Sequence, residues 1–97
     1  MTDRPAPQVG SITVRYWAAA RAAAGVESDE LPAREGTTLA DVLVAVRSLH
    51  PDRERLAAVV SVCSVLVGDR PVGRADPAEV RLRAGDVVEL LPPFAGG

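Results

Sequence analysis

The sequence contains no lysine, one cysteine and one histidine, and these scarcities exclude several kinds of chemistry. All eleven basic residues are arginine, so no side-chain amine can serve as a Schiff base, a general base or an isopeptide acceptor. Cys63 cannot form an internal disulfide, and with His50 it supplies too few ligands for a metal site. We expect no bound metal or cofactor, a small apolar role for Cys63, and a capping or solvated role for His50.

Long apolar runs and a strong charge of either sign are also missing. The formal charge of -2 gives no general attraction to nucleic acid or to an anionic membrane. No segment approaches the roughly 20 apolar residues that a membrane span requires, and residues 1–8 lack the apolar core of a signal peptide. A chain of 97 residues with 47% hydrophobic content is typical of one globular domain. We therefore expect a cytoplasmic protein.

The chain divides into three parts. Residues 1–9 contain two prolines and are expected to form a disordered leader. Residues 10–91 are expected to form the folded domain, and residues 92–97 a flexible C-terminal tail. Each part has its own composition, and only the middle one carries the periodic apolar patterns of helices and strands.

The first half of the domain predicts two strands and two helices. Residues 12–17 alternate apolar and polar side chains, which is typical of a strand with one buried face. Residues 18–24 are rich in alanine and favour a short helix that Gly25 ends. Residues 27–33 indicate a second strand, at an edge because of Pro32.

The main helix is predicted from residue 39 to residue 49. Thr37 and Thr38 are candidate N-caps, Asp41 lies three residues after Thr38 in a capping-box arrangement, and Pro51 prevents continuation. An apolar stripe at helical spacing supports this assignment and consists of Leu39, Val42, Leu43, Val46 and Leu49. Residues 52–60 are expected to add only a short second turn.

The second half predicts three more strands. Residues 65–67 indicate a buried strand, Gly68 and Asp69 a hairpin turn, and residues 70–72 a short return. A turn at residues 84–86 precedes a last strand at residues 87–91. Several strands with one long helix between them predict an α+β fold, a mixed sheet packed on one main helix.

The end of the sequence predicts a reactive tail. Glycine has no side chain, so Gly96 and Gly97 can enter a channel too narrow for other residues. The six residues from Pro92 to Gly97 can extend about 20 Å. We expect the carboxylate of Gly97 to react, while the rest of the tail occupies a partner's channel, namely Gly96, Ala95, Phe94, Pro93 and Pro92. The alternative is an inert, frayed end.

Strand parity predicts where partners bind. If residues 12–17 and 87–91 are strands, one set of side chains faces the main helix, namely Ile12, Val14, Tyr16, Val88 and Leu90. Trp17, Val87 and Leu91 then lie on the opposite face. Apolar residues on an uncovered face usually mark an interface. We expect Trp17 and Leu91, together with Pro71 of the hairpin, to form it.

Four separated segments resemble one protein family: residues 14–21, 36–43, 67–69 and 85–97. The most specific feature is the turn Gly85-Asp86, followed by a strand and a terminal Pro-Pro-x-x-Gly-Gly. Together they resemble the MoaD/ThiS family of ubiquitin-like sulfur carriers, and most closely its molybdopterin synthase small-subunit branch. The resemblance covers residues 12–97 and implies a ubiquitin-like β-grasp fold.

The resemblance also implies a chemistry for Gly97. An E1-like adenylyltransferase would use ATP to adenylate the Gly97 carboxylate, and a sulfur donor protein would displace AMP to leave a thiocarboxylate. In the molybdopterin branch, the carrier docks on a large catalytic subunit, in an expected heterotetramer, and gives sulfur to a pyranopterin precursor. The resemblance implies a carrier that is not catalytic by itself.

The residues leave several alternatives open. A sulfur carrier for cysteine biosynthesis can end in a very similar tail, and a carrier for thiamine biosynthesis is a further possibility. A ubiquitin-like protein modifier begins with the same adenylate, so the tail does not distinguish it from a sulfur carrier. A β-grasp binding module with an inert tail is the last alternative.

Overall fold

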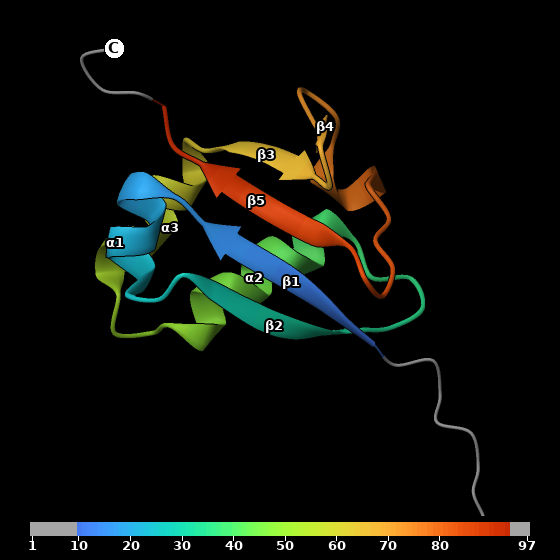
Figure 1. The fold of residues 1–97 in the computed structure, drawn as a ribbon, viewed down its shortest axis with the longest axis horizontal. Helices are drawn as coiled ribbons and strands as arrows, with labels where there is room; N and C mark the ends of the chain where they lie inside the picture. The colour runs from blue at the N-terminus through green and yellow to red at the C-terminus, as the bar shows by residue number, and fades with distance from the viewer. Residues whose placement is uncertain (1–9, 94–97) are drawn as a thin grey trace, which may run out of the picture.

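The computed structural model describes residues 10–93 and contains a five-stranded sheet with helices on one face (Figure 1). The strand order is β2-β1-β5-β3-β4, in which β1 and β5 are parallel and the other neighbours antiparallel. This architecture confirms the predicted mixed sheet and α+β class. The elements in chain order are β1 (Gly10–Tyr16), α1 (Ala18–Ala24), β2 (Ser28–Ala33), α2 (Leu39–Leu49), α3 (Glu54–Ser61), β3 (Ser64–Val67), β4 (Arg70–Pro71), the 3₁₀ helix η1 (Pro77–Glu79) and β5 (Val87–Leu91).

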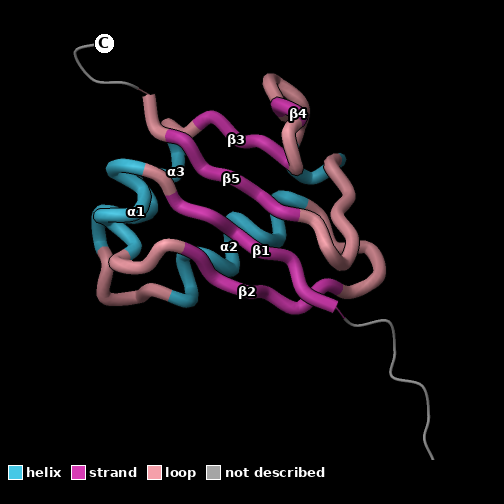
Figure 2. Tube along the Cα trace, in the orientation of Figure 1, coloured by secondary structure: helices cyan, strands magenta, loops and turns pink. Residues whose placement is uncertain are grey.

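The core lies between the sheet and the helices behind it (Figure 2). The two central strands, β1 and β5, supply fully buried side chains, and α2 and α3 supply the facing ones. The predicted parity is confirmed, because the inward residues of the central strands are all buried: Ile12, Val14, Tyr16, Val88 and Leu90. The other face of the sheet carries no helix (Figure 1).

Helix α2 has the predicted bounds and the predicted cap. The Thr38 side chain accepts a hydrogen bond from the Asp41 amide, and the Asp41 side chain accepts one from the Thr38 amide, which completes a capping box. The prediction that the apolar stripe extends to Leu49 is wrong, because this side chain is 46% exposed. Ten positions from Leu39 make about 2.8 turns, so Leu49 lies on the flank of the stripe in the last turn.

Two other expectations need correction. Residues 52–60 do not form a single turn, because α3 is an eight-residue helix that buries Leu56 and Val60, one turn apart. Strand β3 is half-buried rather than buried, since its outer neighbour β4 has only two residues and leaves it near the edge of the sheet. The apolar pair in α3 shares one face, which is the signal that sequence analysis missed.

The local turns agree with the sequence. Gly25 ends α1 in the left-handed conformation, with φ 82°, and its amide donates to the Arg21 carbonyl. Gly68, with φ 65°, begins the two-residue turn between Val67 and Arg70.

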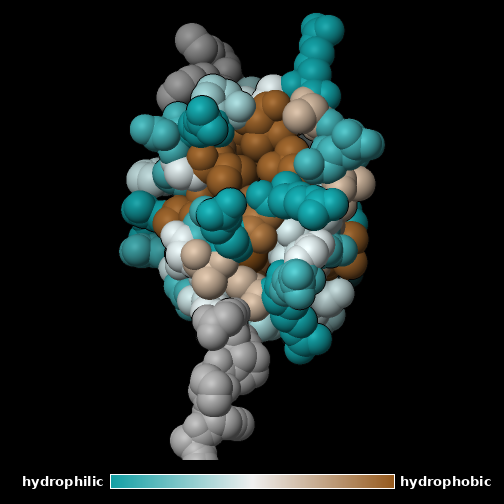
Figure 3. All heavy atoms as spheres, turned by 90° about the vertical axis from the view of Figure 1, so that its right-hand side faces the viewer, coloured by the Kyte–Doolittle hydropathy of each residue, from teal (hydrophilic) through white to brown (hydrophobic). Residues whose placement is uncertain are grey.

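Viewed from the end that carries β4 and η1, hydrophobic surface gathers between charged side chains (Figure 3). Among residues 10–93, every helix is too short or too polar to cross a bilayer.

Candidate functional site

The base of the predicted tail is held at the centre of the sheet. Strand β5 pairs with β1 on one side and with β3 on the other, and it ends at Leu91. Pro92 is half-buried and Pro93 is exposed, so the chain leaves the sheet at this point. The remaining tail residues, Phe94, Ala95, Gly96 and Gly97, lie outside the described residues.

Strand register places Trp17 and Leu91 side by side on the uncovered face. Tyr16 pairs with Leu90, and the Trp17 amide donates to the Leu90 carbonyl at 3.2 Å. The residues that follow Tyr16 and Leu90 therefore lie on the open face, which is the face of the sheet that no helix covers. They are Trp17, which is 41% exposed, and Leu91, which is half-buried. These two apolar residues border the point where the tail leaves the sheet.

Two charged neighbours hold the indole of Trp17 in place. Its Nε1 donates to Oε1 of Glu89 on β5 at 2.9 Å. The guanidinium of Arg15 lies over the ring, with 5.1 Å between its Cζ and the ring centroid. A cation over an indole is attracted by the ring electrons, so both contacts restrict the side chain. The Trp17 side chain is therefore partly preordered, which lowers the conformational entropy that it would lose on burial.

The backbone next to Trp17 is strained. Ala18, the first residue of α1, has φ 49°, in the left-handed region that disfavours residues other than glycine. Such a conformation costs about 1–2 kcal/mol and persists where the surrounding structure requires it. Here it turns the chain sharply from β1 into α1 and leaves Trp17 at the corner, beside the end of β5.

Pro71 lies apart from the other two residues of the predicted interface. It is exposed and pairs with Leu66 of β3, and Leu66 pairs with Glu89 of β5. Pro71, Leu66 and Glu89 therefore share the open face. However, β4 is the edge strand, two strands from β5. The structure thus brings Trp17 and Leu91 together and leaves Pro71 at the rim of the same face.

Three residues of this face were not predicted to belong to the interface: Arg15 and Glu89, which hold Trp17, and Leu66, which extends the apolar area towards Pro71. The alternation in β5 points Glu89 to the open side, so this residue could have been found from parity. Leu66 could not, because three consecutive apolar residues in β3 show no alternation.

A second polar cluster lies on the opposite, covered side. Asp29 Oδ2 accepts a hydrogen bond from Tyr16 Oη at 2.7 Å and lies 2.6 Å from His50 Nε2. Burial raises the pKa of the Tyr16 phenol far above its ordinary value, and the bond to Asp29 raises it further. His50 occupies the C-cap position of α2, but its side chain contacts Asp29 and is only 15% exposed, so the solvated alternative is wrong.

The described residues offer little for metal or thiol chemistry. Between residues 10 and 93, no three His, Cys, Asp or Glu side chains are grouped closely enough to bind a metal ion. Cys63 is half-buried, its Sγ lies 3.2 Å from the Val59 carbonyl oxygen, and burial raises the pKa of its thiol. A raised pKa keeps the thiol protonated, which fits the small apolar role expected for it.

Comparison with known proteins agrees with this geometry. The ThiS family profile matches residues 14–97. The molybdopterin synthase sulfur carrier subunit of Chlamydomonas reinhardtii is 30% identical over 86 residues, which cover 89% of this chain and 98% of that protein.

Two solved structures have the same fold. A chain in the complex of subunits 1 and 2 of the molybdopterin-converting factor from Helicobacter pylori is 25% identical, with a TM-score of 0.59, over 90% of this chain and 99% of that one. SAMP1 from Haloferax volcanii is 24% identical, with a TM-score of 0.75, over 91% and 100%, and supports the fold alone. The chain therefore belongs to the ThiS family, as a ubiquitin-like β-grasp sulfur carrier of the MoaD/ThiS type and a homologue of the molybdopterin synthase small subunit.

Proposed function

We propose that this chain is the sulfur-carrying small subunit of a molybdopterin synthase. An E1-like partner joins the Gly97 carboxylate to AMP from ATP, with release of pyrophosphate. A sulfur donor protein then supplies sulfur to the acyl carbon, AMP leaves, and a thiocarboxylate remains. The large synthase subunit receives the tail and transfers its sulfur to a pyranopterin precursor. The activation step is needed because a free carboxylate is a poor electrophile.

The observation that carries the proposal is the position of β5. This strand ends where the tail begins, and it also supplies Leu91 and Glu89 to the face that holds Trp17. A partner that docks on this face is therefore placed beside the base of the tail. Because the reacting atoms must approach closely and in the right orientation, a fixed docking point near the tail favours sulfur transfer.

The tail itself suits a preformed channel. Pro92 and Pro93 restrict the backbone at its base, which lowers the entropy lost on threading. Gly96 and Gly97 have no β-carbon to obstruct an attacking group. The family match runs through Gly97, and the relative with the 30% identity is named as the sulfur carrier subunit of molybdopterin synthase.

Intact-mass spectrometry tests the site of sulfur attachment. The chain is incubated with ATP, its activating enzyme and a sulfur source, and we expect a shift that corresponds to one exchange of oxygen for sulfur. A variant that lacks Gly96 and Gly97 is the control and should show no shift. The same shift in that variant would refute the assignment to Gly97.

Titration calorimetry with the large subunit tests the docking face. We expect Trp17→Glu to weaken the complex strongly, because a large aromatic residue at an interface often dominates its energy. The matched control is Val44→Glu, since Val44 is a 54% exposed apolar residue on α2, away from the open face. If both folded variants bind with unchanged affinity, the face is assigned wrongly.

A transfer assay separates the molybdopterin branch from the others. The thiocarboxylated chain is offered to a molybdopterin synthase large subunit with pyranopterin precursor, and in parallel to a cysteine synthase with an activated serine. We expect faster transfer to the pterin. Faster transfer to the serine acceptor would overturn the molybdopterin assignment and leave sulfur carriage in place.

A further inference from the structure

An apolar groove lies between α2 and the connection that follows β4. Its volume is about 520 Å³, and Leu39 and Val60 form its buried floor. Half-buried apolar side chains form the walls, namely Leu43, Val65 and Val72. These residues belong to the helix-covered side and its margin, because Val65 alternates with Leu66, which faces the open side. Leu66 and Pro71, which face the open side, also line the groove, so the groove meets the open face at the edge formed by β3 and β4 but does not include Trp17.

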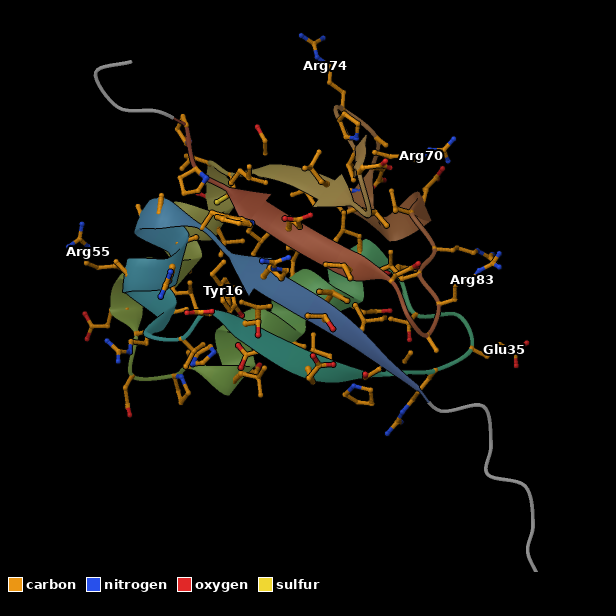
Figure 4. The ribbon with its side chains drawn as sticks, in the orientation of Figure 1. Tyr16, Glu35, Arg55, Arg70, Arg74 and Arg83 are labelled. Carbon is orange, nitrogen blue, oxygen red and sulfur yellow. The ribbon has the colours of Figure 1, made fainter. Side chains whose placement is uncertain are left out.

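The charged residues that line the groove are both cations. They are Arg47, in the last turn of α2, and Arg74, in the loop after β4. Both are exposed, and within residues 10–93 neither forms a salt bridge. Arg74 projects away from the fold, where a partner can reach it (Figure 4). The nearby carboxylate of Asp76 is already engaged, since its Oδ1 accepts a hydrogen bond from the Ala78 amide.

We propose that this groove binds a segment of a partner protein in which apolar side chains are flanked by carboxylates. The apolar side chains would cover Leu43, Val65 and Val72, and the carboxylates would pair with Arg47 and Arg74. Unpaired cations around an apolar surface favour an acidic partner and disfavour a basic one. Trp17 and Leu91 do not line the groove, so this partner can bind without covering them.

A nuclear magnetic resonance titration of the full chain tests the proposal. The probe is a short synthetic helical peptide with two leucines on one face and glutamates at both ends; a control peptide carries lysines in place of the glutamates. We expect the acidic peptide to shift the amide signals of Leu43, Val65 and Val72 and to leave that of Trp17 unchanged. Equal binding of the basic peptide, shifts confined to the open face, or no shifts at millimolar peptide would each overturn it.

Charge reversal gives the matched comparison. The double variant Arg47→Glu/Arg74→Glu should bind the acidic peptide at least about tenfold more weakly, a loss of about 1.4 kcal/mol. The control Arg55→Glu/Arg83→Glu reverses two other exposed arginines, which project from α3 and from the loop before β5 (Figure 4), and should bind normally. Equal losses in both variants would refute a role for the groove. Trp17→Glu should retain peptide binding, so failure of this proposal is distinct from failure of the proposed function.

Discussion

Removal of the Asp29 carboxylate should destabilise the fold strongly, because two side chains depend on one oxygen. Tyr16 is 2% exposed, so its hydroxyl would lose its hydrogen-bond partner inside the protein, and His50 would lose its contact to β2. A hydrogen bond to a charged group contributes about 1.5–3 kcal/mol, so we expect Asp29→Ala to cost about 2–3 kcal/mol. In a domain of this size, that lowers the Tm by about 10–20 °C.

Urea and thermal unfolding measure this cost, and the same strand supplies the control. Glu30 also accepts two side-chain hydrogen bonds, from Ser11 and Thr13, each at 2.8 Å, but on the exposed face. Glu30→Ala should therefore cost less than about 1 kcal/mol. In the Tyr16→Phe background, Asp29→Ala should cost about 1 kcal/mol less than in the parent, because no hydroxyl is left unpaired. Equal costs for Asp29→Ala and Glu30→Ala, or strict additivity with Tyr16→Phe, would refute this reasoning.

Three further predictions follow from buried or tightly packed groups. Tyr16 has a raised pKa in the folded state, so its contribution to stability is complete below its unfolded pKa of about 10 and is lost as the pH rises above it. The one tyrosine should therefore ionise, by ultraviolet absorbance, together with unfolding; tyrosinate in a folded protein near pH 10 would contradict this. Thr38→Ala removes half of the capping box and should cost about 1 kcal/mol in urea unfolding, whereas Ser48→Ala, exposed on the same helix, should be nearly neutral. Gly10→Ala would place the new Cβ atom 2.5 Å from the Ala84 Cβ, so the Tm should fall. An unchanged Tm would show that the loop before β5 can move without a measurable loss of stability.

Sequence reasoning succeeded where the determining interactions are local. The bounds of α2 follow from a capping box, a helical apolar stripe and a proline, all within a few residues of one another. The inward residues of β1 and β5 follow from simple alternation. In α3, the signal was equally local but weak, since only Leu56 and Val60 mark the buried face.

The candidate site was harder to predict, because its contacts depend on strand register. Trp17 and Glu89 meet only because β1 and β5 are parallel neighbours, and no local pattern specifies which residues face each other across that pair. The same holds for Asp29, which joins Tyr16 to His50 from a third element. Parity can assign a residue to a face, but partners across the sheet require the topology.

The central place of β5 also has a consequence for biosynthesis. Thr13 pairs with Val87, so the sheet cannot form its middle until almost the whole domain has left the ribosome. Contacts this distant in sequence make folding slow, since a long loop must close before they form. An incomplete or proteolytically shortened chain that lacks β5 would lack the neighbour that holds Trp17, along with the strand that leads to the tail. A partner that recognises the open face would therefore select completed, folded molecules.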